Sequence, residues 1–421
     1  MISSGLLSSG VIGLLMLTRA WGQVHEPDRN PPFAPGPGDA VRMAEAPFLL
    51  GVTGSPSQEW TFHKTADGNH PSGAEQQMVW LMNRARGNPG IEGIWLAHLR
   101  QSNVQVGMDY FAVQRQVLMD EFSVRSVVPP AAFDNRLYNA ASNHSAYLIS
   151  IDGQNHSNQF ARITAAGFNF SSARGSVYSY AEDSVVGHAV LNVDWGGNDG
   201  TGMQTGRGHR EGVMGIYPSV GISCLADNNP TNAVGPLVTT INYCNPVTSY
   251  SNHYDRFILG TVWNDLNTNS LYDPGEGMGS VTVMPDKGTF FAVTGSAGGY
   301  ALPAVPDSYV VTFFGGGLPS NVVKAVTLGT TSVLVDCPVH SNTNQAQAAL
   351  TVGANWALTY TLNGQRKGYA YRLSISTNLI SGIWDWAGVL PSGYAATLTY
   401  NAQLIDTNVS QRFMTLQGWR Y

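Results

Sequence analysis

The sequence predicts a multidomain protein in which an α+β domain is followed by all-β sandwich domains. The chain has 421 residues, which is more than one ordinary hydrophobic core accommodates, so we expect about two to four domains. Hydrophobic residues recur at helical spacing up to about residue 151, whereas short strand-like segments dominate from about residue 212 onward. Glycine occupies 47 positions and charged residues make up only 12%, about half the usual share. This composition is typical of β-rich extracellular proteins.

The charge balance argues against two classes of partner. Lys and Arg together number 22 and Asp and Glu together number 28, which gives a net charge of −6 without any basic cluster. Nucleic acids and anionic membrane surfaces are bound by concentrated basic surfaces. We therefore expect neither as a partner, and the sequence leaves the oligomeric state open.

The first 22 residues have the pattern of an export signal. An apolar run over residues 6–17 precedes Ala-Trp-Gly at residues 20–22, whose first and last members are small enough for a cleavage site. An ordinary buried helix is the alternative, but the Pro-rich residues 27–37 that follow argue against it. No other stretch approaches the ~20 apolar residues of a membrane span. We therefore expect a secreted or cell-surface protein with signal peptide 1–22 and no transmembrane segment after its removal.

Residues 23–250 divide into a linker and the first domain. Residues 23–70 are rich in Pro, Gly, Ala and Asp, and we interpret them as a linker with little structure. Within residues 71–250 the spacing of hydrophobic residues predicts helices and then strands. The predicted helices are 75–82, ended by Asn88-Pro89-Gly90, then 94–99, 108–122 and 133–151, and the predicted strands include 220–224 and 237–243.

Two β regions follow the first domain. Residues 256–340 contain short strand-like segments separated by Gly, Pro or Asp, which predicts a small β-sandwich. Its predicted strands are 257–263, 281–284, 289–293, 300–302 and 309–314. Residues 343–421 predict a small C-terminal β-domain, with strands at 356–362, 369–376 and 395–400.

Four ionisable residues of the first domain are candidates for a functional site: His144, His156, Glu182 and His209. Each has an ordinary interpretation when taken alone, because a helical histidine such as His144 is usually a core residue and loop histidines are usually solvated. The sequence contains neither two histidines at i, i+4 of a helix nor a G-x-S-x-G turn. Their order and context are more informative than any one of them.

Several short motifs occur in a defined order through the first domain. They are Met82-Asn83-Arg84-Ala85-Arg86-Gly87-Asn88-Pro89, His144-Ser145, Asn155-His156-Ser157, Ala181-Glu182-Asp183, Trp195, Gly208-His209-Arg210 and Val220-Gly221-Ile222. With these motifs, residues 71–250 resemble the bacterial members of the CAP superfamily (SCP-like, cysteine-rich secretory, antigen 5 and pathogenesis-related proteins). The resemblance covers most of the first domain and is far more specific than any single motif.

The resemblance implies an α-β-α sandwich with a cleft lined by histidine and glutamate. Carried over position by position, His156 and His209 correspond to the two cleft histidines, and Glu182 corresponds to a cleft glutamate. Two neutral imidazoles beside a carboxylate can hold a divalent ion such as zinc with open water positions. This sequence departs from the family where the Gly and Asn that flank the glutamate are replaced, and where Asn198 occupies the position of a second glutamate.

From the resemblance we expect a non-enzymatic extracellular binding module for a lipid-like or protein ligand. The alternative is a metal-dependent extracellular hydrolase, acting on peptides or cell walls. In that enzyme Glu182 would be the catalytic base for water on a metal held by His156 and His209. The missing second glutamate weakens the case for catalysis more than it weakens the case for the fold.

A twelve-residue loop near the start of the second region has the oxygen spacing of a calcium site. Asp265, Asn267, Asn269, Asp273 and Glu276 occupy positions 1, 3, 5, 9 and 12, and Leu271 offers its carbonyl at position 7. Hard oxygen ligands favour calcium over transition metals. The Gly that an EF-hand needs at position 6 is absent and strands flank the loop, so it resembles instead the calcium-binding B-type repeat of bacterial surface adhesins. In that repeat the ion stiffens a spacer; the alternative is a polar turn without an ion.

The chain contains three cysteines, Cys224, Cys244 and Cys337. Export makes a Cys224–Cys244 disulfide reasonable, because both residues lie in strand-like segments of one domain. Cys337 would then remain as a buried thiol. None of the cysteine spacings predicts a zinc site.

Overall fold

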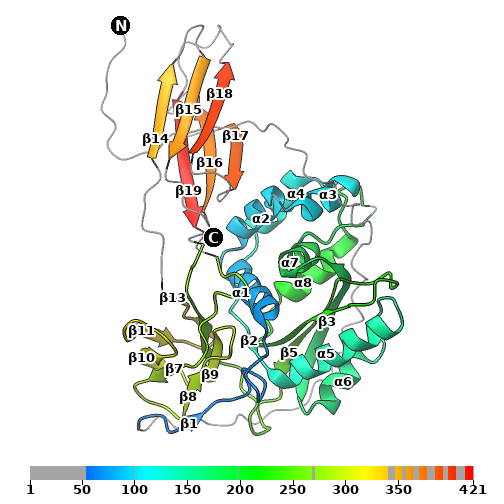
Figure 1. The fold of residues 1–421 in the computed structure, drawn as a ribbon, viewed down its shortest axis with the longest axis vertical. Helices are drawn as coiled ribbons and strands as arrows, with labels where there is room; N and C mark the ends of the chain where they lie inside the picture. The colour runs from blue at the N-terminus through cyan, green and yellow to red at the C-terminus, as the bar shows by residue number, and fades with distance from the viewer. Residues whose placement is uncertain are drawn as a thin grey trace.

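The computed structural model describes residues 54–99, 101–197, 199–267 and 271–339, and beyond these the backbone of six strands between residues 347 and 420. Figure 1 shows a helix-rich unit, a β-sandwich and the six later strands. The predicted signal peptide 1–22 and residues 23–53 of the predicted linker lie outside the described residues. The predicted succession of an α+β region and β-rich regions agrees with this arrangement.

Capping residues set the limits of the first helices. Ser72 and Glu75 form a reciprocal capping box at the start of α1 (Gly73–Gly87). The Asn88 side chain caps α2 (Pro89–His98), where proline suits the first position because no helical partner exists for an N–H there. The predicted helix end at Asn88 is confirmed. The helix predicted over 108–122 is instead two helices, α3 (Ser102–Tyr110) and α4 (Arg115–Ser123), separated at Ala112, whose φ is +52°.

A four-stranded sheet with helices on both faces forms the middle of this unit (Figure 1). Its order is β2 (Ala132–Phe133), β4 (Ser219–Ala226), β5 (Leu237–Pro246) and β3 (Phe170–Ala181), with only the β2–β4 pair parallel. Helices α5 (Asn135–Ser150) and α6 (Gln159–Ala165) cover one face. The other face carries α1, α7 (Ser184–Val193), the 3₁₀ turn η1 (Thr205–Arg207) and α8 (Gly208–Val213).

Alternation along the strands assigns side chains to these two faces. Ala173 and Cys244 pack with Leu137 of α5, whereas Tyr178 and Tyr243 belong to the core shared with α1 and α7. The predicted helix 133–151 and the predicted strands 220–224 and 237–243 are confirmed. Strand β3 and helices α6 and α7 are elements that the sequence did not predict.

Two sheets form the sandwich, whose strands all follow residue 256 except β1 (Gln58–Glu59). Their orders are β1-β8-β7-β10-β11 and β12-β6-β13, with β9 also paired to β6. The bounds are β6 (Phe257–Trp263), β7 (Val281–Pro285), β8 (Phe290–Val293), β9 (Gly299–Pro303), β10 (Asp307–Gly315), β11 (Val322–Leu328), β12 (Val333–Leu334) and β13 (Cys337–Pro338). Leu259, Val283 and Phe313 belong to one core between the sheets. All five predicted strands of this region are confirmed.

Residues 54–70, which we expected to be part of a linker with little structure, pack against the sandwich instead. Strand β1 (Gln58–Glu59) pairs in parallel with β8. Trp60 is 3% exposed within the sandwich core, and its ring lies 5.2 Å from the rings of both Tyr254 and Phe290. Composition did not indicate this burial, because a single tryptophan among polar residues has no periodicity.

The helix-rich unit and the sandwich share part of a core. Trp263 of β6 and Tyr272 belong to the same buried cluster as the apolar face of α1. The rings of Trp80 and Trp263 meet edge to face at 5.9 Å, and Nε2 of Gln77 donates to the carbonyl of Tyr272 at 3.0 Å. The two units are therefore packed together through α1.

The last part of the chain is described only as strands. Strands β14 (Gln347–Val352), β15 (Ala357–Asn363) and β18 (Thr397–Gln403) form one antiparallel sheet, and β17 (Asp385–Pro391), β16 (Tyr369–Ser376) and β19 (Phe413–Arg420) form another. The predicted β character of residues 343–421 is confirmed for these strands. Across the part of the chain that the structure describes, every helix is too short or too polar to span a membrane.

Candidate functional site

His156 lies just before α6, on the face of the sheet that α5 covers. Its Nδ1 donates to Oε1 of Gln159 at 2.6 Å. Nε2 of Gln159 in turn donates to the Ile241 carbonyl at 3.2 Å and to Oδ1 of Asn242 at 2.9 Å, both on β5. A Cβ on Gly175 of β3 would lie only 2.6 Å from the Gln159 side chain. His156 is thus tied to the sheet through Gln159.

His209 lies on the opposite side of the same sheet. It is the second residue of α8 and is fully buried. It donates from Nδ1 to Oδ1 of Asp194 at 2.8 Å and from its backbone N to Oδ2 at 2.9 Å. Helix α8 approaches Tyr243, which belongs to the α1 and α7 side, because a Cβ on Gly212 would lie 2.9 Å from the Tyr243 ring. The sheet therefore separates His209 from His156.

Glu182 is exposed in the turn between β3 and α7. The structure therefore does not bring Glu182, His156 and His209, the residues expected to share a cleft, together at one place. In the described ranges, no set of three His, Cys, Asp or Glu side chains is arranged to hold a metal ion. Sequence order could not reveal this, because motifs that are ordered along a chain can lie on different faces of a sheet.

His144 is a buried residue of α5, as the ordinary interpretation predicts. Its Nε2 donates to the Asn155 carbonyl at 2.9 Å, which leaves Nδ1 to accept from Nη1 of Arg162 at 3.2 Å. Burial, assisted by the charges of Arg162 and His156, lowers the pKa of His144 to about 4. His144 is therefore a neutral residue that positions Arg162.

A buried ionic network that the sequence did not reveal joins α1, α2 and α7. Glu92, which is 1% exposed, accepts two hydrogen bonds of 3.0 Å from Arg84 and one of 2.8 Å from Nε2 of His188. Burial would raise the pKa of Glu92, but Arg84 and His188 together lower it. The Arg84 guanidinium also lies 4.1 Å from the centre of the Trp95 ring. We interpret this enclosed network as structural.

The predicted calcium loop places carboxylates close together beside α1. Asp265 is 2% exposed and Glu276 is 5% exposed. Glu276 accepts from the backbone N–H groups of Leu266, Asn267 and Asp273 at 3.0, 3.4 and 3.0 Å. Burial, with Asp273 and Asp265 nearby, raises the pKa of Glu276 above its usual range. Leu271 is partly buried against the α1 core, and Asn269 lies outside the described residues.

The predicted Cys224–Cys244 disulfide is wrong. In the β4–β5 register Cys244 lies opposite Ser219, whereas Cys224 lies opposite Thr239. At ~3.4 Å per residue the two cysteines are therefore about 17 Å apart along the strands. They also face opposite sides, since Cys244 packs with Leu137 and Cys224 lies against Met78. All three cysteines are free, and Cys337 is a buried thiol as expected.

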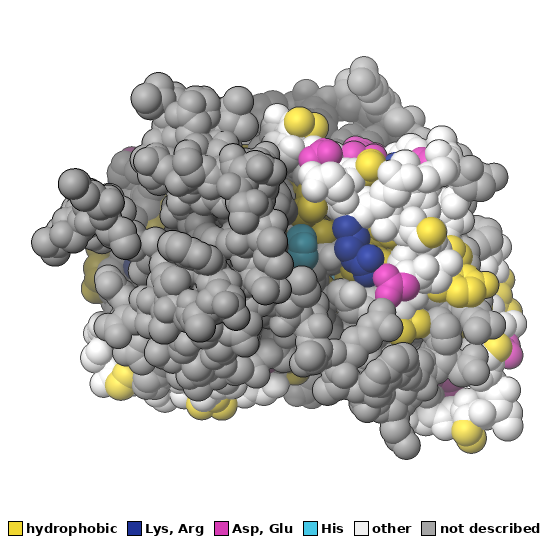
Figure 2. Space-filling model, turned by 90° about the horizontal axis from the view of Figure 1, so that it is seen from above, with side chains coloured by type: hydrophobic (Ala, Val, Ile, Leu, Met, Phe, Trp, Pro, Cys, Tyr) yellow, Lys and Arg dark blue, Asp and Glu magenta, His cyan; other side chains and the backbone are white. Residues whose placement is uncertain are grey.

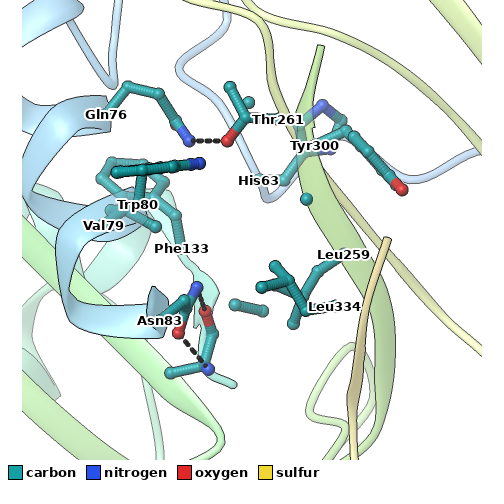
Figure 3. A pocket seen from close by; sticks show the side chains of 14 residues that line it. His63, Gln76, Val79, Trp80, Asn83, Phe133, Leu259, Thr261, Tyr300 and Leu334 are labelled. Atoms are coloured by element: carbon teal, nitrogen blue, oxygen red, sulfur yellow. Dashed lines mark hydrogen bonds between the residues drawn. The ribbon is translucent and has the colours of Figure 1, made fainter. Parts of the chain in front are cut away.

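Figure 3 shows a cavity where α1 meets the sandwich, with Gln76 donating to Oγ1 of Thr261 at 2.8 Å. Asn83, on the same helix, exchanges two hydrogen bonds with the backbone of Ala131. This cavity has room of about 10 Å³ for the centre of a water molecule, so it could hold roughly one water. It is therefore a packing defect of the junction and not a ligand site.

A larger hollow lies on the surface between α5 and α6. It offers about 370 Å³ and is lined by Asn139, Ser142, Asn143, Arg162, Ala165 and Ala166. Small-molecule sites span roughly 300–1,000 Å³, so this groove is large enough for a ligand. On the described part of the face in Figure 2, charged side chains are few among hydrophobic and other neutral ones. The groove is lined by neutral side chains apart from Arg162.

Comparisons with known proteins give no family assignment. No protein-family model matches the chain, and no curated protein matches it. Among solved structures, the chain is similar to a "putative carbohydrate binding protein" from Bacteroides uniformis, at 15% identity over 39% of this chain and 79% of that one, with a TM-score of 0.16. A DUF3823 family protein from Bacteroides ovatus matches at 12% identity over 39% of this chain and 91% of that one, with a TM-score of 0.14.

Proposed function

We propose that this chain is an exported extracellular binding protein and not a hydrolase. In this proposal residues 71–250 form a binding module of the CAP type, an α-β-α sandwich, and the β regions display it. The observation that supports binding over catalysis is the placement of His156 and His209 on opposite faces of the sheet, with Glu182 exposed in a turn. A hydrolytic metal site needs its ligands around one ion with an open water position.

Zinc titration of the full chain tests this function against the hydrolase alternative. His156→Ala and Glu182→Gln change residues outside the fully buried core, so both variants should fold. We expect each variant to match the wild type in zinc affinity. Loss of a stoichiometric zinc site in both variants would overturn the proposal and favour the hydrolase.

We also propose that the loop at residues 265–276 binds calcium in support of this display role. Oxygen donors suit a hard cation. Asp265 and Glu276 are buried, and burial together with the charges of Asp273 and Asp265 raises the pKa of Glu276, so repulsion among these carboxyl groups is unfavourable. Asn267 would add a side-chain oxygen, and Leu271 a carbonyl. A bound calcium ion would offset the repulsion among these carboxyl groups.

Chelation followed by calcium addition tests the calcium proposal. Calcium should raise the melting temperature of the wild type, because an ion that binds the folded state stabilises it. The increase should be largely absent in Asp265→Asn and preserved in Asp255→Asn, a control at an exposed position outside the loop. An equal calcium response in both variants would contradict the assignment.

A further inference from the structure

The groove between α5 and α6 presents hydrogen-bonding groups that the fold leaves available. Asn139 and Asn143 are one helical turn apart on an exposed face of α5. Within the described part of the chain, their side-chain amides form no hydrogen bond to another residue, and each amide has two N–H donors and a carbonyl acceptor. Ser142 lies between them, and its side chain is hydrogen-bonded to that of Tyr138. The α5 side of the groove therefore offers both donors and acceptors.

Arg162 of α6 provides the positive charge of the groove and is held in place. Its Nη1 donates to the Ser157 carbonyl at 2.6 Å and to Nδ1 of His144 at 3.2 Å, and its guanidinium lies 4.9 Å from the centre of the Tyr147 ring. No hydrogen bond to a described residue uses Nε or Nη2 of Arg162. Because a single nitrogen makes both contacts, the Nε–Nη2 edge stays available for a carboxylate, the geometry in which arginine binds that group best.

The chemistry of the groove restricts its ligand. Its lining contains no carboxylate to compete for Arg162, and its apolar part is limited to Ala165 and Ala166, which disfavours a lipid-like ligand. A peptide carboxylate is usually captured by successive backbone N–H groups, whereas here the polar lining beside Arg162 consists of side-chain amides and a hydroxyl. Such groups match a ring of neighbouring hydroxyls with one carboxylate.

We propose that the α5–α6 groove binds a uronic acid unit of an acidic polysaccharide, with its carboxylate on Arg162 and its hydroxyls on Asn139 and Asn143. This assignment rests on the proposed function of the chain as an extracellular binding protein and names its ligand class. The side chains that bind the sugar come from two helices whose packing His144 and Gln159 fix, so the site is preformed.

Calorimetric titration of the full chain with oligogalacturonate tests the assignment. Its fully methyl-esterified form serves as a neutral probe of the same ring, and chelator is present because calcium bridges such carboxylates. We expect the acidic oligomer to bind at least tenfold more tightly than the ester. Asn143→Ala and Arg162→Gln should each weaken its binding about tenfold, the ratio that corresponds to about 1.4 kcal/mol. Arg162→Lys should recover part of the loss.

Arg115→Gln is the control, because Arg115 is a surface arginine paired with Asp109 outside the groove. Equal binding of the acid and its ester, or equal losses in Arg115→Gln and Arg162→Gln, would overturn the assignment. So would tighter binding of a short peptide with a free C-terminus than of the oligomer. Cleavage of the bound oligomer would instead overturn the non-enzymatic function while leaving the ligand class intact, so the two failures are distinguishable.

Discussion

At the scale of single residues, buried histidines make the stability of the fold depend on pH. His63 is 1% exposed and donates from Nε2 to the Val293 carbonyl at 2.9 Å. Burial, together with the neighbouring charge of Lys64, lowers its pKa from 6.5 to about 4. Between pH 4 and pH 6.5 this histidine is protonated in the unfolded chain but not in the folded chain. The free energy of unfolding should therefore rise as the pH increases from about 4 to about 6.5 and then level off.

Denaturant unfolding of His63→Gln checks this dependence. The variant should lose part of the rise between pH 4 and pH 6.5, up to about 3 kcal/mol by the linkage of ~1.4 kcal/mol per pKa unit. Above pH 7 its stability should no longer change relative to the wild type. Parallel pH curves for the two proteins would show that His63 is protonated as easily in the folded state as in the unfolded state.

The buried pair of Asp194 and His209 gives a second prediction at this scale. Asp194 ends α7 in the left-handed conformation, with φ +60°, and its carboxylate accepts two hydrogen bonds from His209. Asn tolerates this conformation, so Asp194→Asn removes charge while preserving shape. We expect a loss of about 1–3 kcal/mol in unfolding free energy, whereas the exposed Asp255→Asn should change it by less than about 0.5 kcal/mol.

At the scale of elements, the contact between α5 and β4 depends on a glycine. A Cβ on Gly221 would lie 2.1 Å from the carbonyl carbon of Leu137, whereas a Cβ on Gly87 at the end of α1 would meet nothing within 4 Å. Gly221→Ala should therefore force α5 away from the sheet and destabilise the protein by about 1–3 kcal/mol. Gly87→Ala should be neutral or stabilise by up to about 1 kcal/mol. Thermal unfolding of both variants makes the comparison, and similar effects would contradict the close packing at Gly221.

The elements that the sequence predicted are those with a one-sided pattern. Helix α5 buries one face and exposes the other, and its predicted limits match. Helix α7 was not predicted because nine of its ten residues are buried. It therefore lacks the polar face on which an amphipathic pattern depends. Strand β3 was missed because much of it consists of small residues such as Ser172, Ala173 and Gly175. These residues let α6 pack close to the strand, but they lack the β-branched side chains by which a strand is recognised in a sequence.

The candidate sites likewise divide into one that the sequence predicted and others that it could not predict. The oxygen spacing of the calcium loop is local in sequence, so Asp265 and Glu276 could be predicted as neighbours. The sequence did not identify the groove, because Asn143 and Arg162 belong to different helices and neither is unusual in its own segment. Nor could it show that His156 and His209 are separated, since the face on which a histidine lies depends on how α6 and α8 pack on the sheet.

At the scale of the whole molecule, the shared core should couple unfolding of the helix-rich unit and the sandwich. Trp263 packs against Trp80 of α1 at 5.9 Å between ring centres and is 2% exposed. Trp263→Ala should cost about 3–5 kcal/mol and lower the melting temperature of both units together. Calorimetry of the full chain checks this. Two separate transitions with only the sandwich shifted would show that the units unfold independently.

The pairing of β1 with β8 has a consequence for the order in which the protein can be completed. His63 bonds to Val293, 230 positions further along the chain, so the segment around β1 cannot pair with β8 until the sandwich strands have been made. At ~5–20 residues per second this delay is roughly 10–50 s. Until β8 has been made, Trp60 lacks the Phe290 ring that it packs against in the folded protein, so this early segment has to wait for strands that are synthesised much later.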